Sequence, residues 1–306
     1  MNPASPSSAA PSFPPVAIGG LGGSGTRIFA AILQAAGVHI GDCLNEPLDN
    51  LWFAVLFKRA AWARAPNPRP PDPNDIATSI RLFQRAMTTG LADRPDGRLS
   101  ASERTLLAQL RADLPPEGSW QCGPKSVHVD NLMTSGPPRV GTDRPWGWKE
   151  PNTHVFLPHL DRHIPGFRYI HVVRDGLDMA FSNNTWQARH WSHLYDLSKD
   201  PRIPLPLRQL RYWCAANRRA LDYGAAHMPG RFLAVHYEDF CDRPTLHWAR
   251  IMGFLGPTEN LDLPDSMVRP STIGRSAAHD LSEFPESDLA KVRVLQSEVE
   301  KIGQPD

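Results

Sequence analysis

The chain has 306 residues, 41% of them hydrophobic and 8% aromatic, so it can build a sizeable core and wholesale disorder is excluded. Its 33 Lys and Arg residues balance 32 Asp and Glu residues to a net charge of +1, which argues against a protein that binds nucleic acid through a general basic excess. The four cysteines lie far apart with no C-x-x-C pair, which disfavours a zinc ribbon, a thioredoxin-type site and a disulfide scaffold.

Residues 1–15 are rich in Pro, Ser and Ala and lack the basic start and apolar centre of a signal peptide, so we expect a disordered tail there. No stretch reaches the roughly 18 uninterrupted apolar residues of a membrane-spanning helix, so we expect no transmembrane segment and a cytoplasmic setting. Residues 16–306 are expected to form a single α/β domain.

The first folding signal is a short apolar run at 16–18, followed by GGLGGSGT and then by IFAAILQAAGV, whose apolar residues recur at helical spacing. This pattern predicts a strand, a glycine loop and a helix. Three helical segments are predicted next, at 49–64, 75–90 and 100–112. They predict a helical cap, inserted at about 50–120, beside the sheet.

Two more strand–turn–helix units follow. RYIHVV leads into the turn RDG and a helix that begins with LDMAFSNNTW, and RFLAVHY leads into EDF and a helix over about 244–255. Residues 284–303 predict a C-terminal amphipathic helix. Strands that alternate with helices are typical of a parallel sheet with helices on both faces, so the predicted fold is a three-layer α/β domain.

The glycine loop is predicted to bind a phosphate-like anion. Glycine lets the backbone wrap closely around an anion, and the following helix presents free N–H groups and the positive end of its dipole. Ser24 and Thr26 add hydroxyl groups and Arg27 adds a cation. A nucleoside-triphosphatase loop would need Lys before Ser or Thr, which is missing here, whereas a dinucleotide-type G-x-G-x-x-G match, with Glu46 some 20 residues on, stays open from the loop alone.

A second anion site is predicted after the strand RYIHVV. Arg174 stands at the end of that strand, and Ser182 follows eight residues later, inside the start of the predicted helix. A guanidinium can hold a phosphate through two hydrogen bonds, and the serine hydroxyl can reach the same oxygens if the turn folds back. In isolation, the segment could equally be an Arg–Asp turn at the surface.

Taken together, the two segments resemble the sulfotransferase family. S-G-T at 24–26 is similar to the loop with which that family holds a 5′-phosphosulfate. Arg174, Asp178 and Ser182 are similar to its motif for a 3′-phosphate. WKEP at 148–151 resembles the family's lysine-bearing strand end.

The similarity extends further along the chain. VHYEDFCDRPTLHWARIMGFLG, at 235–256, resembles the Y-E-D strand of the family with its helix and F-L-G ending. In all, the resemblance covers roughly residues 16–56 and 146–280.

The resemblance implies a P-loop NTPase-like fold, 3′-phosphoadenosine 5′-phosphosulfate (PAPS) as donor, no metal, and in-line transfer of a sulfuryl group to an acceptor hydroxyl or amine. The residues implied in cradling the 5′-phosphosulfate are Gly22, Gly23, Ser24, Gly25, Thr26 and Arg27. Lys149 is implied to neutralise charge on the bridging oxygen, and Arg174 and Ser182 to hold the 3′-phosphate. Arg269 and Arg275, in RPSTIGR, could close over the nucleotide.

One position departs from the family pattern. Many relatives carry Lys immediately before the S-G-T element, whereas this chain has Gly23. Transfer of a sulfuryl group, like that of a phosphoryl group, depends on cations and positioning. Either Arg27 and Lys149 supply the missing charge, or the donor binds weakly.

The resemblance also suggests where a catalytic base would lie. The first candidate is Glu46 in LNEPLDNLWF, followed by Asp49 in the same segment and His154 after the lysine strand. Glu46 could instead cap a helix or pair with an arginine.

The glycine loop leaves two other functions open: a nucleotide-dependent kinase or switch, and a non-catalytic nucleotide-binding protein. The sequence does not identify the acceptor, which could be a small molecule, a carbohydrate or a lipid-linked alcohol, and it leaves the oligomeric state open. Nucleic acid is not expected as a partner, because the charges of the chain are balanced. A metal ion is not expected either, because no histidine pair has a third ligand at suitable spacing.

Overall fold

The computed structural model describes residues 14–63, 68–92, 99–113, 125–138, 145–197, 200–256 and 273–303. Of the tail expected at 1–15, all but Pro14 and Pro15 therefore falls outside the described residues. The carbonyl of Pro15 accepts a hydrogen bond of 2.9 Å from the Arg168 backbone N–H, so the chain joins the sheet just before its first strand.

The centre of the molecule is a parallel sheet. The described residues form four strands in the order β2-β1-β3-β4: β1 (Val16–Gly20), β2 (Gly147–Lys149), β3 (Arg168–Val173) and β4 (Phe232–His236). Ile18 lies opposite Lys149 on one side and Ile170 on the other. Parallel strands need crossover connections, and helices supply them here, which confirms the predicted α/β class with its flanking helices.

Helices occupy the segments between and after the strands. Before β2 lie α1 (Thr26–Ala35), α2 (Leu51–Phe57), α3 (Ala60–Ala63), α4 (Pro73–Thr88), α5 (Ala101–Arg111) and α6 (Lys125–Met133). Between β2 and β4 lie the 3-10 helix η1 (Pro151–Phe156), α7 (Leu157–His163), α8 (Gly176–Ala180), α9 (Trp186–Trp191), the 3-10 helix η2 (Ser192–Tyr195) and α10 (Leu205–His227). After β4 come α11 (Tyr237–Asp242), α12 (Pro244–Leu255), the 3-10 helix η3 (Arg275–Ala278) and α13 (Glu286–Gly303).

Successive residues of the strands point to opposite faces of the sheet, and each face builds its own core. Val16, Ile18 and Ile170 pack with apolar residues of α1 and α12. Ala17 and Tyr169 belong to the second core, which includes apolar residues of α10 and α13. The strands are therefore buried on both faces, as the apolar runs of the sequence predict.

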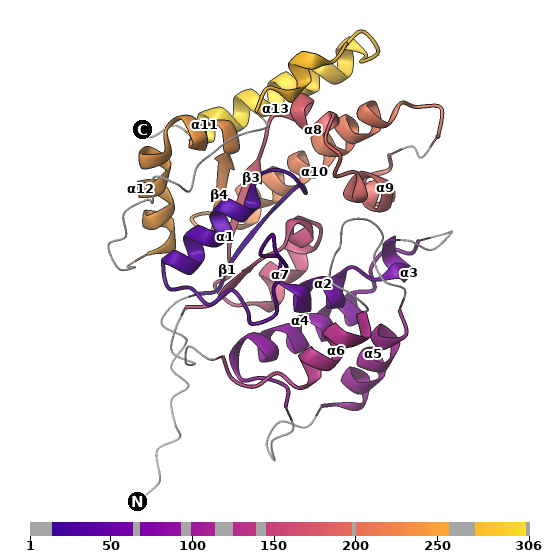
Figure 1. Cartoon of the computed structure of the whole chain (residues 1–306), viewed down its shortest axis with the longest axis vertical. Coiled ribbons are helices and arrows are strands. Elements are labelled where there is room, and N and C mark those ends of the chain that lie inside the picture. Colours follow the sequence, from indigo (N-terminus) through magenta and orange to yellow (C-terminus); the bar gives the residue numbers. More distant parts are fainter. Residues whose placement is uncertain are drawn as a thin grey trace, which may run out of the picture.

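Helices α2 to α6 gather beside the sheet, at the lower right of Figure 1. An aromatic cluster joins them to the sheet, because the ring of Phe53 in α2 stacks on Phe57 at 4.3 Å and on Trp148 of β2 at 5.7 Å. Helices α2 to α6 lie between residues 51 and 133, and the helical insertion expected at about 50–120 stays a prediction. The assignment of 16–306 to one domain stays a prediction.

The structure corrects two details of the sequence analysis. The segment 49–64 is broken into α2 and α3, because the chain leaves the helical conformation at Lys58. Ser182 lies after α8 rather than inside a helix start, since α8 ends at Ala180. Gln209 donates hydrogen bonds to the carbonyl oxygens of Ala180 and Ser182, at 2.6 and 3.1 Å, and so replaces partners that a longer helix would provide.

One long element was not predicted at all. Helix α10 spans 23 residues, and Leu210, Trp213 and Ala216 on its buried face recur at helical spacing. The helical spacing of these apolar residues was present in the sequence, but the segment directly follows the proline cluster at 200–206, which is typical of a break in regular structure.

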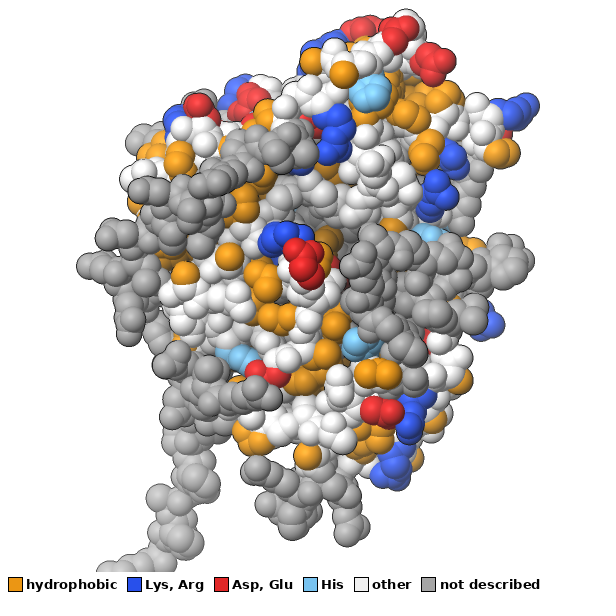
Figure 2. Space-filling view, viewed as in Figure 1, with side chains coloured by type: hydrophobic (Ala, Val, Ile, Leu, Met, Phe, Trp, Pro, Cys, Tyr) orange, Lys and Arg blue, Asp and Glu red, His pale blue; other side chains and the backbone are white. Residues whose placement is uncertain are grey.

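Charged side chains of both signs are interspersed with apolar ones over the face drawn in Figure 2. None of the described helices is both long and apolar enough to cross a membrane.

Candidate functional site

A pocket of about 800 Å³ lies at the carboxyl ends of the strands. The ends of parallel strands meet at one edge of a sheet, so the loops that follow them converge there. The pocket is lined by the loop after β1, by Lys149 at the end of β2, by Arg174 directly after β3 and by Tyr237 directly after β4. The segments singled out in the sequence therefore meet at one place.

The glycine loop leaves the N-terminus of α1 open to the pocket. Gly25 precedes α1 with φ 86°, and no side chain among the described residues caps the helix there. A Cβ at Gly25 would lie 2.1 Å from Cε2 of Tyr237, so only glycine fits this position. Gly22 and Thr26 also line the pocket. Backbone N–H groups and a helix dipole at such an end favour a bound anion.

The conformation of the loop at position 23 favours glycine. Gly23 has φ +100°, a conformation that strains any residue with a side chain, and its Cβ would come 3.3 Å from Oγ of Ser182. The hydroxyl of Ser24 donates to the carbonyl of Leu21 and is buried, so this serine braces the loop from inside. The loop therefore turns backbone rather than a charged side chain toward the pocket at this position.

Arg174, directly after β3, contacts the glycine loop. Its Nη1 donates to the Gly23 carbonyl oxygen at 3.2 Å, and its Nη2 lies 3.6 Å from Oδ2 of Asp178. The guanidinium also lies over the ring of Tyr237, 5.3 Å from its centre. Arg174 is 5% exposed, so a buried cation is fixed at the edge of the pocket beside the loop.

Ser182, expected to hold the 3′-phosphate with Arg174, and Arg275, expected to close over the nucleotide, both lie near Arg174. Ser182 is near Gly23, as described above, and its Oγ accepts a hydrogen bond from the Asn184 backbone N–H at 3.2 Å. Arg275 donates to the backbone carbonyl of Asp178 at 3.3 Å. Arg269 lies outside the described residues.

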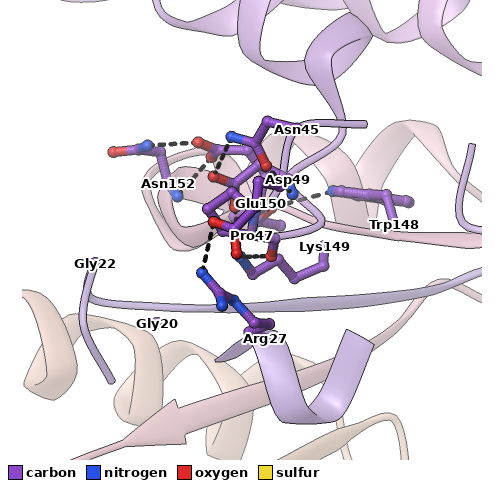
Figure 3. A network of polar contacts seen from close by, with 12 residues as sticks. Gly20, Gly22, Arg27, Asn45, Pro47, Asp49, Trp148, Lys149, Glu150 and Asn152 are labelled. Carbon is purple, nitrogen blue, oxygen red and sulfur yellow. Dashed lines mark hydrogen bonds and ion pairs between the residues drawn. The ribbon is translucent and has the colours of Figure 1, made fainter. Parts of the chain in front are cut away.

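Lys149 is held at the end of β2 by the segment that follows α1. Its Nζ donates to Oδ1 of Asp49 at 2.5 Å and to the Pro47 carbonyl oxygen at 2.9 Å, as Figure 3 shows. Asp49 is fixed in turn, because its Oδ2 accepts a hydrogen bond of 3.0 Å from Asn45. Lys149 and Asp49 both line the pocket, so a cation and a carboxylate face the same space.

The other two candidates for a base occupy different surroundings. Glu46 forms an exposed ion pair with Arg27 at 3.0 Å, and its side chain is 78% exposed. His154 is buried beneath the pocket, where its Nδ1 lies 2.8 Å from the Pro151 carbonyl oxygen and its Nε2 lies 3.3 Å from the Tyr212 hydroxyl. Burial lowers the pKa of His154 to about 4. Their catalytic roles stay predictions, but only Asp49 of the three lines the pocket.

Several polar residues of the pocket were not predicted as site residues from the sequence. Lys58, Glu150, Asn152 and Gln187 are all buried and line the pocket. Burial raises the pKa of the Glu150 carboxyl, and Lys58 lies 3.9 Å from it. Lys58 stands in the helical segment predicted at 49–64 and Glu150 in the W-K-E-P segment, but their meeting depends on how α2 packs beside the sheet.

Within the described part of the chain, no three His, Cys, Asp or Glu side chains gather into a group that could hold a metal ion.

Comparison with known proteins gives the family of this chain. The model of the family described as "Sulfotransferase family" matches residues 14–260, so the chain belongs to the sulfotransferase family. A search of curated proteins found no match.

Solved structures of sulfotransferases are similar over most of the chain. The sulfotransferase domain of the Synechococcus PCC 7002 olefin synthase is 17% identical, with 97% of this chain and 95% of that chain covered and a TM-score of 0.39. Sulfotransferase STF1 from Mycobacterium tuberculosis H37Rv is 17% identical, with 95% and 76% covered and a TM-score of 0.41. The sulfotransferase domain from the curacin biosynthetic pathway is 15% identical, with 96% and 97% covered and a TM-score of 0.40.

Proposed function

We propose that this sulfotransferase uses PAPS as donor and transfers the sulfuryl group in line to an acceptor hydroxyl or amine. The observation that carries the proposal is the contact between the two predicted anion sites: Arg174 donates to the carbonyl of Gly23 at 3.2 Å. Two segments that lie 151 positions apart in the sequence therefore border one pocket, as a ligand with a phosphate at each end requires.

The residues present fit such a donor. The open end of α1 and the backbone of 22–25 suit the 5′ group, whereas Arg174 and Ser182 suit the 3′-phosphate. Lys149 lies between the loop and the segment of Asp49, where it can neutralise charge that develops on a leaving oxygen. When bound, PAPS would supply the sulfuryl group, with 3′-phosphoadenosine 5′-phosphate as the leaving group.

We propose Asp49 rather than Glu46 as the group that takes the proton of the acceptor. Asp49 faces the pocket, while Glu46 is exposed and held by Arg27. A base must lie within hydrogen-bond reach of the proton that it removes, which favours the carboxylate inside the pocket. Asp49 would also keep Lys149 in place.

The acceptor class stays open among small molecules, carbohydrates and lipid-linked alcohols. The cytoplasmic setting expected from the sequence likewise stays a prediction.

Nucleotide binding tests the donor. Thermal denaturation would be measured with 3′-phosphoadenosine 5′-phosphate (PAP), the desulfated product, and with ATP and magnesium. A ligand that binds the folded chain raises its melting temperature by mass action, so PAP is expected to stabilise and ATP with magnesium is not. The reverse ranking would favour the kinase alternative, and transfer of labelled sulfate from PAPS to acceptor pools would establish the reaction.

Replacement of Arg174 by alanine tests the second anion site. Arg174→Ala should weaken the binding of PAP at least tenfold and leave the binding of adenosine 5′-phosphate nearly unchanged. The reason is that a charged hydrogen bond to the 3′-phosphate is worth about 1.5–3 kcal/mol. Isothermal titration calorimetry measures both affinities. Arg202→Ala, which removes an exposed arginine that pairs with Asp200, is the matched control. Equal losses for the two nucleotides would remove Arg174 from this role.

A further inference from the structure

A chain of buried amides runs along one wall of the pocket from the glycine loop. The backbone N–H of Gly22 donates to Oε1 of Gln187 at 2.8 Å, and Nε2 of Gln187 donates to Oδ1 of Asn152 at 3.0 Å. Gln187 is 6% exposed and Asn152 is 3% exposed. The second residue of α9 is therefore tied to the loop that follows β1.

The chain continues into the helical insertion. Nδ2 of Asn152 donates to Oε1 of Glu150 at 2.8 Å, and the Asn152 backbone N–H donates to Oε2 of Glu150 at 2.6 Å. Glu150 lies 3.9 Å from Nζ of Lys58, which stands at the end of α2. Figure 3 shows Asn152 and Glu150 together above the strand that leads to Gly22.

The direction of each hydrogen bond is fixed. The Gly22 backbone N–H can only donate, so it requires the oxygen of Gln187. Oδ1 of Asn152 already accepts from the indole N–H of Trp191 at 2.8 Å, while its Nδ2 faces a carboxylate. The side chain of Gln187 therefore fits in one orientation, with its oxygen toward the loop and its nitrogen toward Asn152.

Helix α9 also contacts the end of α2 and helix α3 of the insertion. Nδ1 of His190 lies 3.0 Å from the Ala63 carbonyl oxygen, and Nζ of Lys58 lies 4.3 Å from the centre of the Trp186 ring. Trp186, Gln187, Arg189 and His190 all line the pocket. We call these four residues the α9 wall. It lies between the glycine loop, which suits the donor, and the insertion.

We infer that Gln187 is a positioning residue that couples the glycine loop to the α9 wall, so that donor binding orders the wall. This inference rests on the proposed function, because it takes the glycine loop as the donor site. A bound anion restricts the loop, and the restricted loop holds Gly22 in place for Gln187. Coupling is reciprocal, so loss of the Gln187 hydrogen bonds must also weaken binding of the sulfuryl donor.

Hydrogen–deuterium exchange of the full chain, with and without PAP, tests the coupling. PAP is expected to increase the protection of peptides that span 186–191, and Gln187→Met is expected to abolish that increase at equal occupancy. The comparison is made within each protein, so a change in basal stability cancels. Gln34→Met, on the exposed face of α1, is the matched control and should keep the increase. Calorimetry should show a 3- to 10-fold weaker PAP affinity for Gln187→Met, the size of one or two neutral hydrogen bonds.

A second pair of variants keeps the test decisive if methionine unfolds the chain. Gln187→Glu retains an oxygen for Gly22 but sets a second oxygen against Oδ1 of Asn152, so it should also abolish the increase. Asn184→Asp introduces the same charge beside the same loop, since Nδ2 of Asn184 lies 2.5 Å from a Cβ built at Gly22, but Asn184 is not part of the amide chain. Asn184→Asp should weaken the binding of PAP but keep the PAP-induced increase in protection over 186–191.

The outcomes separate this inference from the proposed function. If the unaltered protein does not bind PAP, the proposed function fails. If it binds PAP and the Gln187 variants still show the full increase over 186–191, the donor site stands and the coupling is wrong. Parallel loss in Gln187→Glu and Asn184→Asp would assign the effect to charge and overturn the inference as well.

Discussion

Asp49 and Lys149 are bound to each other in the pocket, which gives the aspartate two possible duties. Its Oδ1 accepts from Lys149 and its Oδ2 from Asn45, yet the carboxylate borders the pocket. Leu48, the residue before it, has φ 66°, so the segment turns sharply to present this carboxylate. A residue that both holds the cation and takes a proton would influence the donor and the acceptor together.

Two single substitutions decide between the candidate bases. Asp49→Asn should lower the rate of labelled-sulfate transfer by about 10²–10⁴-fold, the usual contribution of a general base. Glu46→Gln should lower it by less than about tenfold, because Glu46 is 78% exposed on its side chain and outside the pocket. Rates would be measured with the acceptor that the transfer screen identifies, and PAP affinity by calorimetry. A larger loss for Glu46→Gln would restore the first candidate of the sequence analysis.

Among the secondary-structure elements, Asp178 connects α8 to a distant segment. Its Oδ2 accepts from the Gly274 backbone N–H and its Oδ1 from that of Ser276, both at 2.8 Å. Burial alone would raise the pKa of Asp178, but the hydrogen bonds from Ser276 and Gly274 outweigh it, and the pKa lies below its ordinary value. The carboxylate of Asp178, the aspartate of the R-x-x-x-D motif, thus anchors η3 beside Arg174.

Removal of this anchor should loosen η3 and destabilise the fold. Asp178→Ala should lower the free energy of unfolding by about 2–4 kcal/mol, because the backbone N–H groups of Gly274 and Ser276 lose a charged acceptor that is itself buried. Urea unfolding measures the loss, and hydrogen exchange should show faster exchange over 273–278. Asp222→Ala, which removes an exposed carboxylate paired with Arg218, should cost less than about 1 kcal/mol. A loss of equal size in both would contradict the anchoring role.

At the scale of the whole molecule, two buried histidines join β3, η1 and α10. Nδ1 of His171 lies 3.1 Å from the Tyr169 hydroxyl, and its Nε2 lies 2.9 Å from Oδ1 of Asn217. The ring centre of His154 lies 6.3 Å from that of His171. Burial lowers the pKa of His154 to about 4 and that of His171 to about 3, so both are neutral in the folded protein near pH 7.

These histidines should make the fold sensitive to acid. Their pKa is lower in the folded chain than the ordinary 6.5, so the unfolded chain binds more protons below that pH. Their contribution is complete above pH 6.5 and is lost as the pH falls toward 4 and 3. Each histidine should lower the free energy of unfolding by about 1.4 kcal/mol for every pH unit below 6.5, so the two together should lower it by roughly 5 kcal/mol at pH 4.5. Urea unfolding between pH 7.5 and 4.5 measures this loss.

The matched variant for this prediction is His154→Asn, which removes one of the two titrating groups. Whatever its absolute stability, the slope of unfolding free energy between pH 6 and 5 should fall by about 1.4 kcal/mol per unit. An unchanged slope would show that His154 does not titrate as its burial requires.

The class of the fold could be predicted from local sequence patterns. Continuous apolar runs such as RYIHVV have too little polar surface to face water, so they predicted strands buried on both sides, and the helices between them predicted parallel pairing. The S-G-T and R-x-x-x-D-x-x-x-S patterns are local and could be read directly. The family match over 14–260 confirms what those patterns suggested about the kind of protein.

The tertiary structure alone decided which side chains share the pocket. Glu46 and Asp49 are three positions apart in one segment, but the turn at Leu48 leaves Glu46 exposed and sends Asp49 to Lys149. Gln187 gave no signal in the sequence, because its partner lies 165 positions away and an amide has no distinctive spacing. Local patterns are set by neighbours along the chain, whereas burial and hydrogen-bond partners depend on elements that meet only after folding.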